Sequence, residues 1–149
     1  MQNISKRTKL IRHNVAVAAG VTTITPSAGV DTKGFAGCLF IVHWGAIVTG
    51  GVQSIECHSS TDDGVADAYA ALSTSKVNVT DADDNKITYL DVYRPRERFL
   101  KCIVNRATQN ATVDSITAIL YDPVVMPTTH DAATVSGGEL HVAEPAGTA

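Results

Sequence analysis

Turn residues divide the middle of this 149-residue chain into short apolar segments, and this spacing constrains the fold more than any other feature. The segments are rich in valine, isoleucine and threonine, which favour strands over helices. They cover residues 15–24, 35–48, 52–57, 77–79, 86–93, 98–107 and 113–121. Strands of this number and spacing predict an all-β fold, an antiparallel β-sandwich or jelly roll. Strands and helices do not alternate, so we do not expect a parallel nucleotide-binding sheet.

Local signals between the strands predict one turn and one helix. Residues 49–51 (TGG) predict a hairpin turn that returns the segment 35–48 alongside the segment 52–57. Residues 65–72 (VADAYAAL) are rich in alanine and predict the single short helix of the fold. The helix is at most two turns long, so tertiary packing must support it.

The core is expected to be aliphatic, because only 5% of the residues are aromatic. Trp44 lies in the most apolar segment and is therefore assigned to the core. The three cysteines Cys38, Cys57 and Cys102 also lie within apolar strand-like segments. Three is an odd number, so we expect buried reduced thiols that act as small hydrophobic side chains, as in a protein made in the cytoplasm.

The two ends of the chain differ from this middle. Residues 1–14 are polar and basic, and residues 123–149 are dominated by Thr, Ala, Gly and Pro. Neither end contains enough apolar residues to form a core. The sequence therefore predicts a body at residues 15–122 with extended N- and C-terminal arms at 1–14 and 123–149. Arms of this kind point to a chain that is held by neighbouring molecules.

Several functional classes lack support in the sequence. A net charge of −3 argues against a nucleic-acid partner, and no apolar stretch reaches the ~20 residues of a membrane span. The histidines lack the spacing of zinc ligands, and residues 81–86 (DADDNK) lack the glycine of a calcium loop. With no nucleophile elbow or phosphate-binding loop, we expect no cofactor, no metal and no enzyme. Catalysis would require distant residues to converge.

Two groups of basic residues are candidates for binding a partner. The first group lies in the N-terminal arm and comprises Lys6, Arg7, Lys9 and Arg12. The second group flanks Pro95 and comprises Arg94, Arg96 and Arg98. A proline-containing turn can hold guanidinium groups toward carboxylates on another protein. The alternatives are a solvated turn, in which Glu97 neutralises part of the charge, and a merely soluble chain end.

Three segments together resemble small structural proteins of tailed bacteriophages. They are residues 91–95 (DVYRP), residues 98–106 (RFLKCIVNR) and residues 116–123 (ITAILYDP). The shared pattern is a strand that ends in Arg-Pro, a strand that carries Val-x-Arg-Ala-Thr, and a strand that ends in Tyr before a tail with prolines. The resemblance covers roughly residues 86–127.

The resemblance implies a virion protein, most closely a head decoration (cement) protein. Such a protein would be made in the host cytoplasm and would lie on the capsid surface. Its partners would be the major capsid protein and further copies of itself, with a trimer as the expected oligomer. The sequence leaves open another virion role, in the tail or the head-to-tail connector. A jelly-roll module that binds a glycan or another ligand is the third hypothesis.

Overall fold

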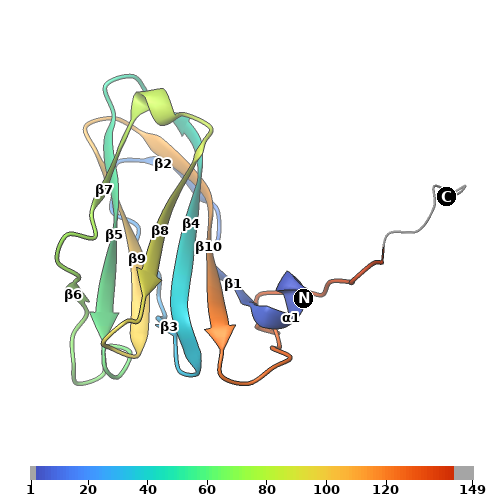
Figure 1. Ribbon diagram of the computed structural model, residues 1–149. Helices are drawn as coiled ribbons and strands as arrows, with labels where there is room; N and C mark the ends of the chain where they lie inside the picture. The colour runs from blue at the N-terminus through green and yellow to red at the C-terminus, as the bar shows by residue number, and fades with distance from the viewer. Residues whose placement is uncertain (1–2, 143–149) are drawn as a thin grey trace, which may run out of the picture.

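The protein is an all-β sandwich of two antiparallel sheets, as a computed structural model of the chain shows (Figure 1). The structure describes residues 3–142, so the outermost parts of the two expected arms, residues 1–2 and 143–149, lie outside the described residues. Within residues 3–142 the helical elements are α1 (Ile4–Arg7) and the 3₁₀ turn η1 (Asp81–Asp83). The predicted fold class is therefore confirmed.

Each sheet contains five strands. Sheet A has the order β1-β10-β4-β8, and β2 also pairs with β10. Its strands are β1 (Lys9–Asn14), β2 (Val17–Gly20), β4 (Phe35–Ile47), β8 (Ile87–Tyr93) and β10 (Ala111–Pro123). Sheet B has the order β3-β9-β5-β6, and β7 also pairs with β5. Its strands are β3 (Val30–Asp31), β5 (Val52–Ser60), β6 (Ala70–Ala71), β7 (Val77–Thr80) and β9 (Phe99–Ala107).

The core lies between the sheets and follows the two-residue period of the strands. Alternate side chains of β4, β10, β9 and β5 point inward and exclude water. They include Phe40, Val42, Ile116, Leu120, Leu100, Val104 and Ile55, together with the three cysteines. Trp44 is only 2% exposed and donates from Nε1 to the Thr88 hydroxyl over 3.0 Å. The predictions for Trp44 and for buried thiols are confirmed.

Burial should make all three thiols unreactive in the folded protein. It raises the pKa of Cys57 to about 12 and also raises the pKa values of Cys38 and Cys102. Since only the thiolate attacks a disulfide reagent, we expect Ellman's reagent to detect no thiol at pH 8 in native protein. It should detect all three after unfolding in denaturant. Rapid labelling of the native protein would contradict this packing.

The helix predicted at residues 65–72 is wrong. The segment is a loop that ends in the short strand β6. The Asp62 side chain accepts hydrogen bonds from the backbone N–H groups of Val65, Ala66 and Asp67, at 2.7–3.1 Å. The hydrogen bonds to Asp62 hold the first amides of the segment in a turn. A short alanine-rich segment has too little helix propensity to replace this turn with a helix.

The predicted hairpin at residues 49–51 is also wrong. β4 belongs to sheet A and β5 to sheet B, so the turn carries the chain from one sheet to the other. Gly50 has a φ of 84°, which explains the glycine at this position. The true neighbours of β4 are β10 and β8, whereas β5 pairs with β9, β6 and β7.

The N-terminal arm is shorter than predicted. Its second half forms β1, which pairs with β10 from Lys9 to Asn14, so the body begins at Lys9 and not at residue 15. The C-terminal arm folds back along β1 over residues 128–134 and then leaves the body (Figure 1). The boundary that follows from local composition misses β1, because this strand is held by a partner about 110 residues away along the chain.

Two polar side chains join the sheets from inside. Arg106 on β9 is 5% exposed and donates to the carbonyl oxygens of Ala18, Thr22 and Ala111 over 2.6–2.8 Å. Gly20 makes room for it, since a Cβ there would lie 3.3 Å from Nη2. His13 on β1 accepts the backbone N–H of Cys102 at Nε2 over 3.2 Å. Both contacts fasten the N-terminal segment across the open side of the sandwich.

Candidate partner-binding surface

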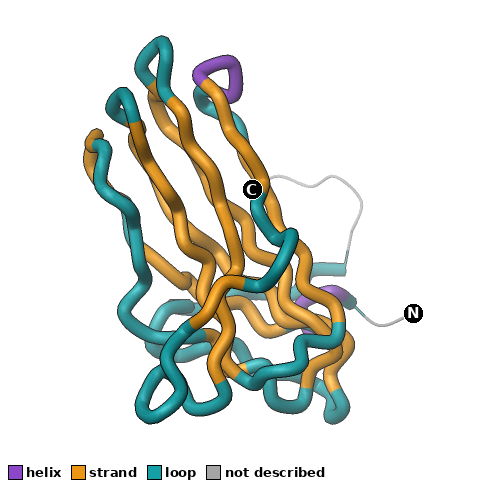
Figure 2. The backbone as a smooth tube through the Cα atoms, turned by 90° about the vertical axis from the view of Figure 1, so that its left-hand side faces the viewer, coloured by secondary structure: helices purple, strands orange, loops and turns teal. Residues whose placement is uncertain are grey.

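Two loops at one end of the sandwich hold the second predicted group of basic residues. The loop 94–98 connects β8 to β9 and the turn 32–34 connects β3 to β4, so both cross between the sheets. Figure 2 shows the loops that gather at the two ends of the body. Thr32 is buried and bonds to the Arg98 carbonyl oxygen through its N–H and its hydroxyl, at 2.9 and 2.8 Å. The two loops therefore form one fixed unit.

The backbone of this unit fixes the position from which the Arg94 side chain extends. Arg94 has a φ of 51°, which is uncommon for a residue with a Cβ. Its N–H donates to the Ala36 carbonyl oxygen over 2.8 Å, and its guanidinium carbon lies 5.1 Å from the centre of the Tyr93 ring. Pro95 follows directly and restricts the backbone further. The side chain thus starts from a constrained backbone and stacks on an aromatic ring.

A hollow of about 550 Å³ lies between the two loops. Its lining includes Lys33, Phe35 and the whole loop 94–98. A second hollow of about 330 Å³ adjoins it, because Lys33 and Phe35 line both. Lys9, residues 123–125 and residues 127–129 line the second hollow. Lys33 therefore lies between Lys9, from the first predicted group, and the loop 94–98, which carries the second group.

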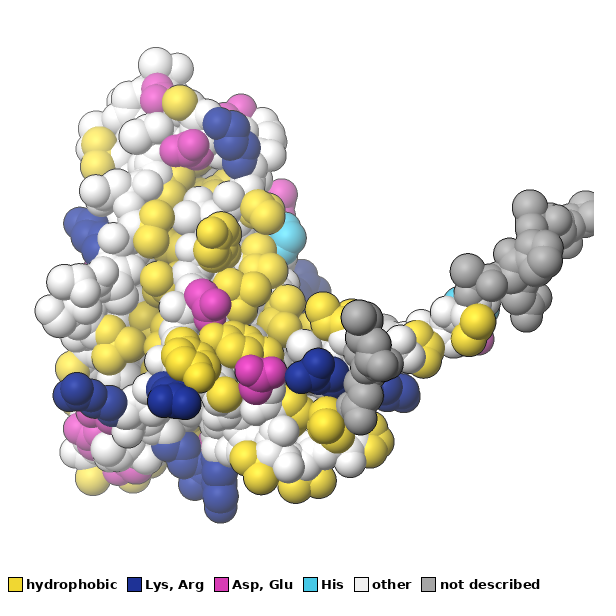
Figure 3. All heavy atoms as spheres, in the orientation of Figure 1, with side chains coloured by type: hydrophobic (Ala, Val, Ile, Leu, Met, Phe, Trp, Pro, Cys, Tyr) yellow, Lys and Arg dark blue, Asp and Glu magenta, His cyan; other side chains and the backbone are white. Residues whose placement is uncertain are grey.

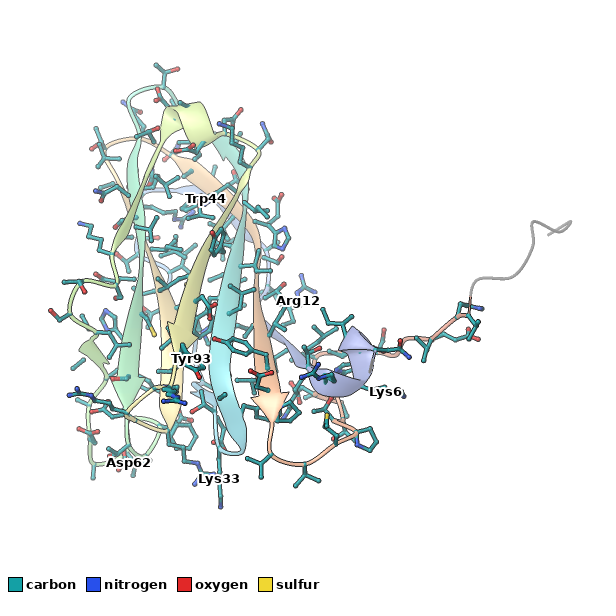
Figure 4. The ribbon with its side chains drawn as sticks, in the orientation of Figure 1. Lys6, Arg12, Lys33, Trp44, Asp62 and Tyr93 are labelled. Carbon is teal, nitrogen blue, oxygen red and sulfur yellow. The ribbon has the colours of Figure 1, made fainter. Side chains whose placement is uncertain are left out.

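We call Lys9, Lys33, Arg94 and Arg96 the basic band. Within residues 3–142, no carboxylate lies within 4.0 Å of the charged groups of these four side chains. Figure 4 shows Lys33 at the lower end of the body, below Tyr93, and Figure 3 shows several Lys and Arg side chains along this end. Unpaired cations around a hollow can form ion pairs with carboxylates of another molecule at little desolvation cost.

The remaining predicted residues differ in how they are placed. Arg98 is already paired, because Nε and Nη2 donate to the Asp31 carboxylate over 2.8 and 2.6 Å. These bonds lower the pKa of Asp31. Arg7 lies 3.6 Å from the Asp122 carboxylate. Lys6 lies on α1, and Arg12 lies on the outer face of β1 beside residues 131–135 (Figure 4). Arg98 therefore serves to hold the two loops together.

The outer face of sheet A next to the basic band is unusually apolar. On the edge strand β8, Ile87, Tyr89 and Tyr93 are each more than half exposed. Leu39 and Ile41 on β4 lie beside them and are half-buried. Figure 3 shows apolar side chains gathered over β4 and β8. An exposed apolar sheet face with cations at its rim is typical of a protein–protein interface.

One polar interaction on this face is fully satisfied within the chain. Tyr121 on β10 leans across Gly37 on β4 and donates to Asp91 on β8 over 2.7 Å. A Cβ at Gly37 would lie 2.4 Å from the Tyr121 ring, so the ring needs the glycine. Burial and the bond to Asp91 raise the pKa of Tyr121. With Asp91 already bonded, the face offers a partner mainly apolar contact.

Lys33 and the apolar face were not predicted from the sequence. Lys33 stands alone in a turn, and no local pattern signals that its loop meets the loop 94–98. The outward residues of β8 could be recognised by their period, since Ile87, Tyr89 and Tyr93 occupy alternate positions. The register that places them next to Leu39 and Ile41 is not visible in a single sequence.

No protein-family model and no curated protein matches this chain. Among the described residues, no helix is both long and apolar enough to cross a membrane. No group of three or more metal-ligating side chains occurs within residues 3–142.

Proposed function

We propose that the chain is a structural virion protein of a tailed bacteriophage that binds the outside of the capsid lattice as a homo-oligomer. The major capsid protein is the proposed partner, and the protein acts without catalysis. The observation that carries the proposal is the combination of the basic band with the bare apolar face of sheet A. The resemblance of residues 86–127 to phage structural proteins supports the same role.

The surface suits a lattice-binding role for two physical reasons. The apolar face supplies contact area, and the unpaired cations supply attraction to acidic side chains and select their position. A homo-oligomer multiplies such contacts, because each further subunit binds at a high effective concentration. A rigid body without a deep cleft among its described residues offers less to a small ligand such as a glycan.

Removing two charges from the basic band should weaken capsid binding. We expect the Arg94→Gln/Arg96→Gln double variant to bind phage heads at least about tenfold more weakly than the wild type, which is about 1.4 kcal/mol. The effect should shrink as salt is added, because exposed charges are screened. Binding is measured by co-sedimentation with heads that lack the protein.

The matched control is Lys76→Gln/Lys86→Gln, which removes the same charge from exposed positions away from the basic band. It should bind within about twofold of the wild type. Equal loss in both double variants would mean that only net charge matters, and wild-type protein that does not bind heads at all would refute the proposed function. Electron microscopy of the particles then separates many copies over the head from a single connector ring.

A further inference from the structure

The two edges of sheet A are treated differently by the chain. The outer edge of β1 is covered by the protein's own C-terminal arm. Leu10 N–H donates to His130 Nδ1 over 3.1 Å, Arg12 N–H donates to Thr134 Oγ1 over 3.0 Å, and Asp131 N–H donates to the Leu10 carbonyl oxygen over 3.2 Å. This cover satisfies backbone groups that would otherwise attract another strand.

The opposite edge, β8, has no such cover. Within the described residues β8 pairs with β4 only, so one side of its backbone is unpaired from Ile87 to Tyr93. The strand contains no proline, lysine or bulge, which are the usual means of blocking an edge. Its outward side chains are the exposed Ile87, Tyr89 and Tyr93, together with Asp91, which accepts the Tyr121 hydroxyl. This edge is suited to accept an added strand.

The segment 136–142 (SGGELHV) has the properties of a strand without a sheet. After Val135, whose N–H bonds to the Asp131 carbonyl oxygen, no described hydrogen bond joins residues 136–142 to the body. Leu140 and Val142 alternate with Glu139 and His141, which is the pattern of a half-buried strand. Figure 1 shows that the segment extends away from the body on the β1 side, away from β8.

Distance prevents this segment from pairing along the whole length of β8 in its own chain. Three strand spacings separate β1 from β8, or about 14 Å at ~4.8 Å each. Crossing them takes about four extended residues at ~3.3 Å each, which leaves about three residues for pairing. Residues 136–142 equal the whole of β8 in length, so a full-length pairing requires the β8 of another molecule.

We propose that residues 136–142 of one copy add as a strand to the β8 edge of a second copy and continue its sheet A. Leu140 and Val142 then lie on one face of the extended sheet, and Glu139 and His141 lie on the other. Donor and acceptor lie on opposite edges, so the contact is head-to-tail and a closed ring satisfies every copy. The inference rests on the proposed homo-oligomer and names the surfaces that form it.

The oligomeric state tests the segment. We expect the full-length wild type to sediment as an oligomer, and the Leu140→Asp/Val142→Asp variant to become monomeric at the same concentration, with association at least tenfold weaker. The control Val65→Asp places a charge at a highly exposed valine in the loop 61–69 and should leave the mass unchanged. A monomeric wild type, or a double variant that keeps the wild-type mass, would overturn the inference.

Disulfide trapping tests the edge. A Leu140→Cys variant is mixed with a Tyr89→Cys variant, because these two positions face each other when residues 136–142 pair antiparallel along the whole of β8. A covalent dimer should form in the mixture in greater yield than in either variant alone. Val65→Cys in place of Tyr89→Cys is the control and should give no such dimer. A dominant dimer of Tyr89→Cys with itself would show that two β8 edges meet each other, and this would refute the head-to-tail arrangement.

These results are independent of capsid binding. A monomeric protein that still binds phage heads would refute the proposed assembly and leave the proposed function intact. An oligomer that forms through residues 136–142 but does not bind heads would refute the function and leave the assembly intact. The segment could instead bind the capsid protein. In that case the wild type would be monomeric, and the Leu140→Asp/Val142→Asp variant would have the same mass but would no longer bind phage heads.

Discussion

Replacing Arg106 with methionine should lower the free energy of unfolding by about 3–5 kcal/mol, a large part of the total stability of a domain of this size. The guanidinium donates to three backbone carbonyl oxygens and to the Thr22 hydroxyl. Methionine keeps the aliphatic stem but leaves these acceptors without a donor, and each unsatisfied buried group costs about 1–3 kcal/mol. Urea unfolding followed by circular dichroism gives the value.

The control for Arg106 is Arg96→Met. Arg96 is exposed and has no ion-pair partner among the described residues, so its replacement should change stability by less than about 0.5 kcal/mol. Arg106→Lys should fall between the two, because a single ammonium group cannot reach all three carbonyls. If Arg106→Met and Arg96→Met were equally stable, Arg106 would not be the link between β9 and the N-terminal segment.

Lowering the pH should destabilise the protein through His13. The ring is buried against Phe40, with ring centroids 5.2 Å apart, and Lys101 lies near enough to add repulsion. Burial first, and Lys101 second, lower the pKa of His13 from 6.5 to about 4. Between these two values the unfolded chain binds a proton that the folded chain does not. The free energy of unfolding therefore falls as the pH falls from about 7 toward 4.

The expected size of this loss is about 2.5 kcal/mol at pH 4.5, at 1.36 kcal/mol for each unit of pKa difference. Carboxylates also titrate in this range, so the measurement compares the wild type with His13→Gln, which keeps an acceptor for the Cys102 N–H and does not titrate. When the pH is lowered from 7 to 4.5, the free energy of unfolding of the wild type should fall by about 2.5 kcal/mol more than that of the variant. A difference that is independent of pH would contradict a neutral, buried His13.

The strands could be predicted from the sequence because their signal is local. The boundaries of β8, β9 and β10 agree with the predicted segments to within two residues. The choice of partner strand is not local. Residues 49–51 would suit a hairpin equally well, and the contacts of β4 with β10 decide against it. The helix predicted at residues 65–72 does not form because the Asp62 side chain accepts hydrogen bonds from three backbone N–H groups of the segment. These bonds outweigh the helix propensity of its alanines.

The candidate surface was only partly predictable for the same reason. Arg94 and Arg96 could be recognised because Pro95 fixes them in a short charged loop. Lys33 joins them only because both loops cross between the sheets at the same end of the body. Arg98 has the same charge and the same loop, yet its pairing with Asp31 across 67 positions gives it a different role. No property of its immediate neighbours distinguishes it from Arg96.

The position of β10 in sheet A has a consequence for biosynthesis. β10 lies between β1 and β4 and also pairs with β2, and all three are translated before it. A nascent chain that ends before residue 111 therefore has no central strand on which to assemble this sheet. Its apolar segments stay exposed until β10 has been synthesised or a chaperone binds them. Assembly of sheet A must follow the release of β10 from the ribosome, at the slow rate that long-range strand pairing imposes.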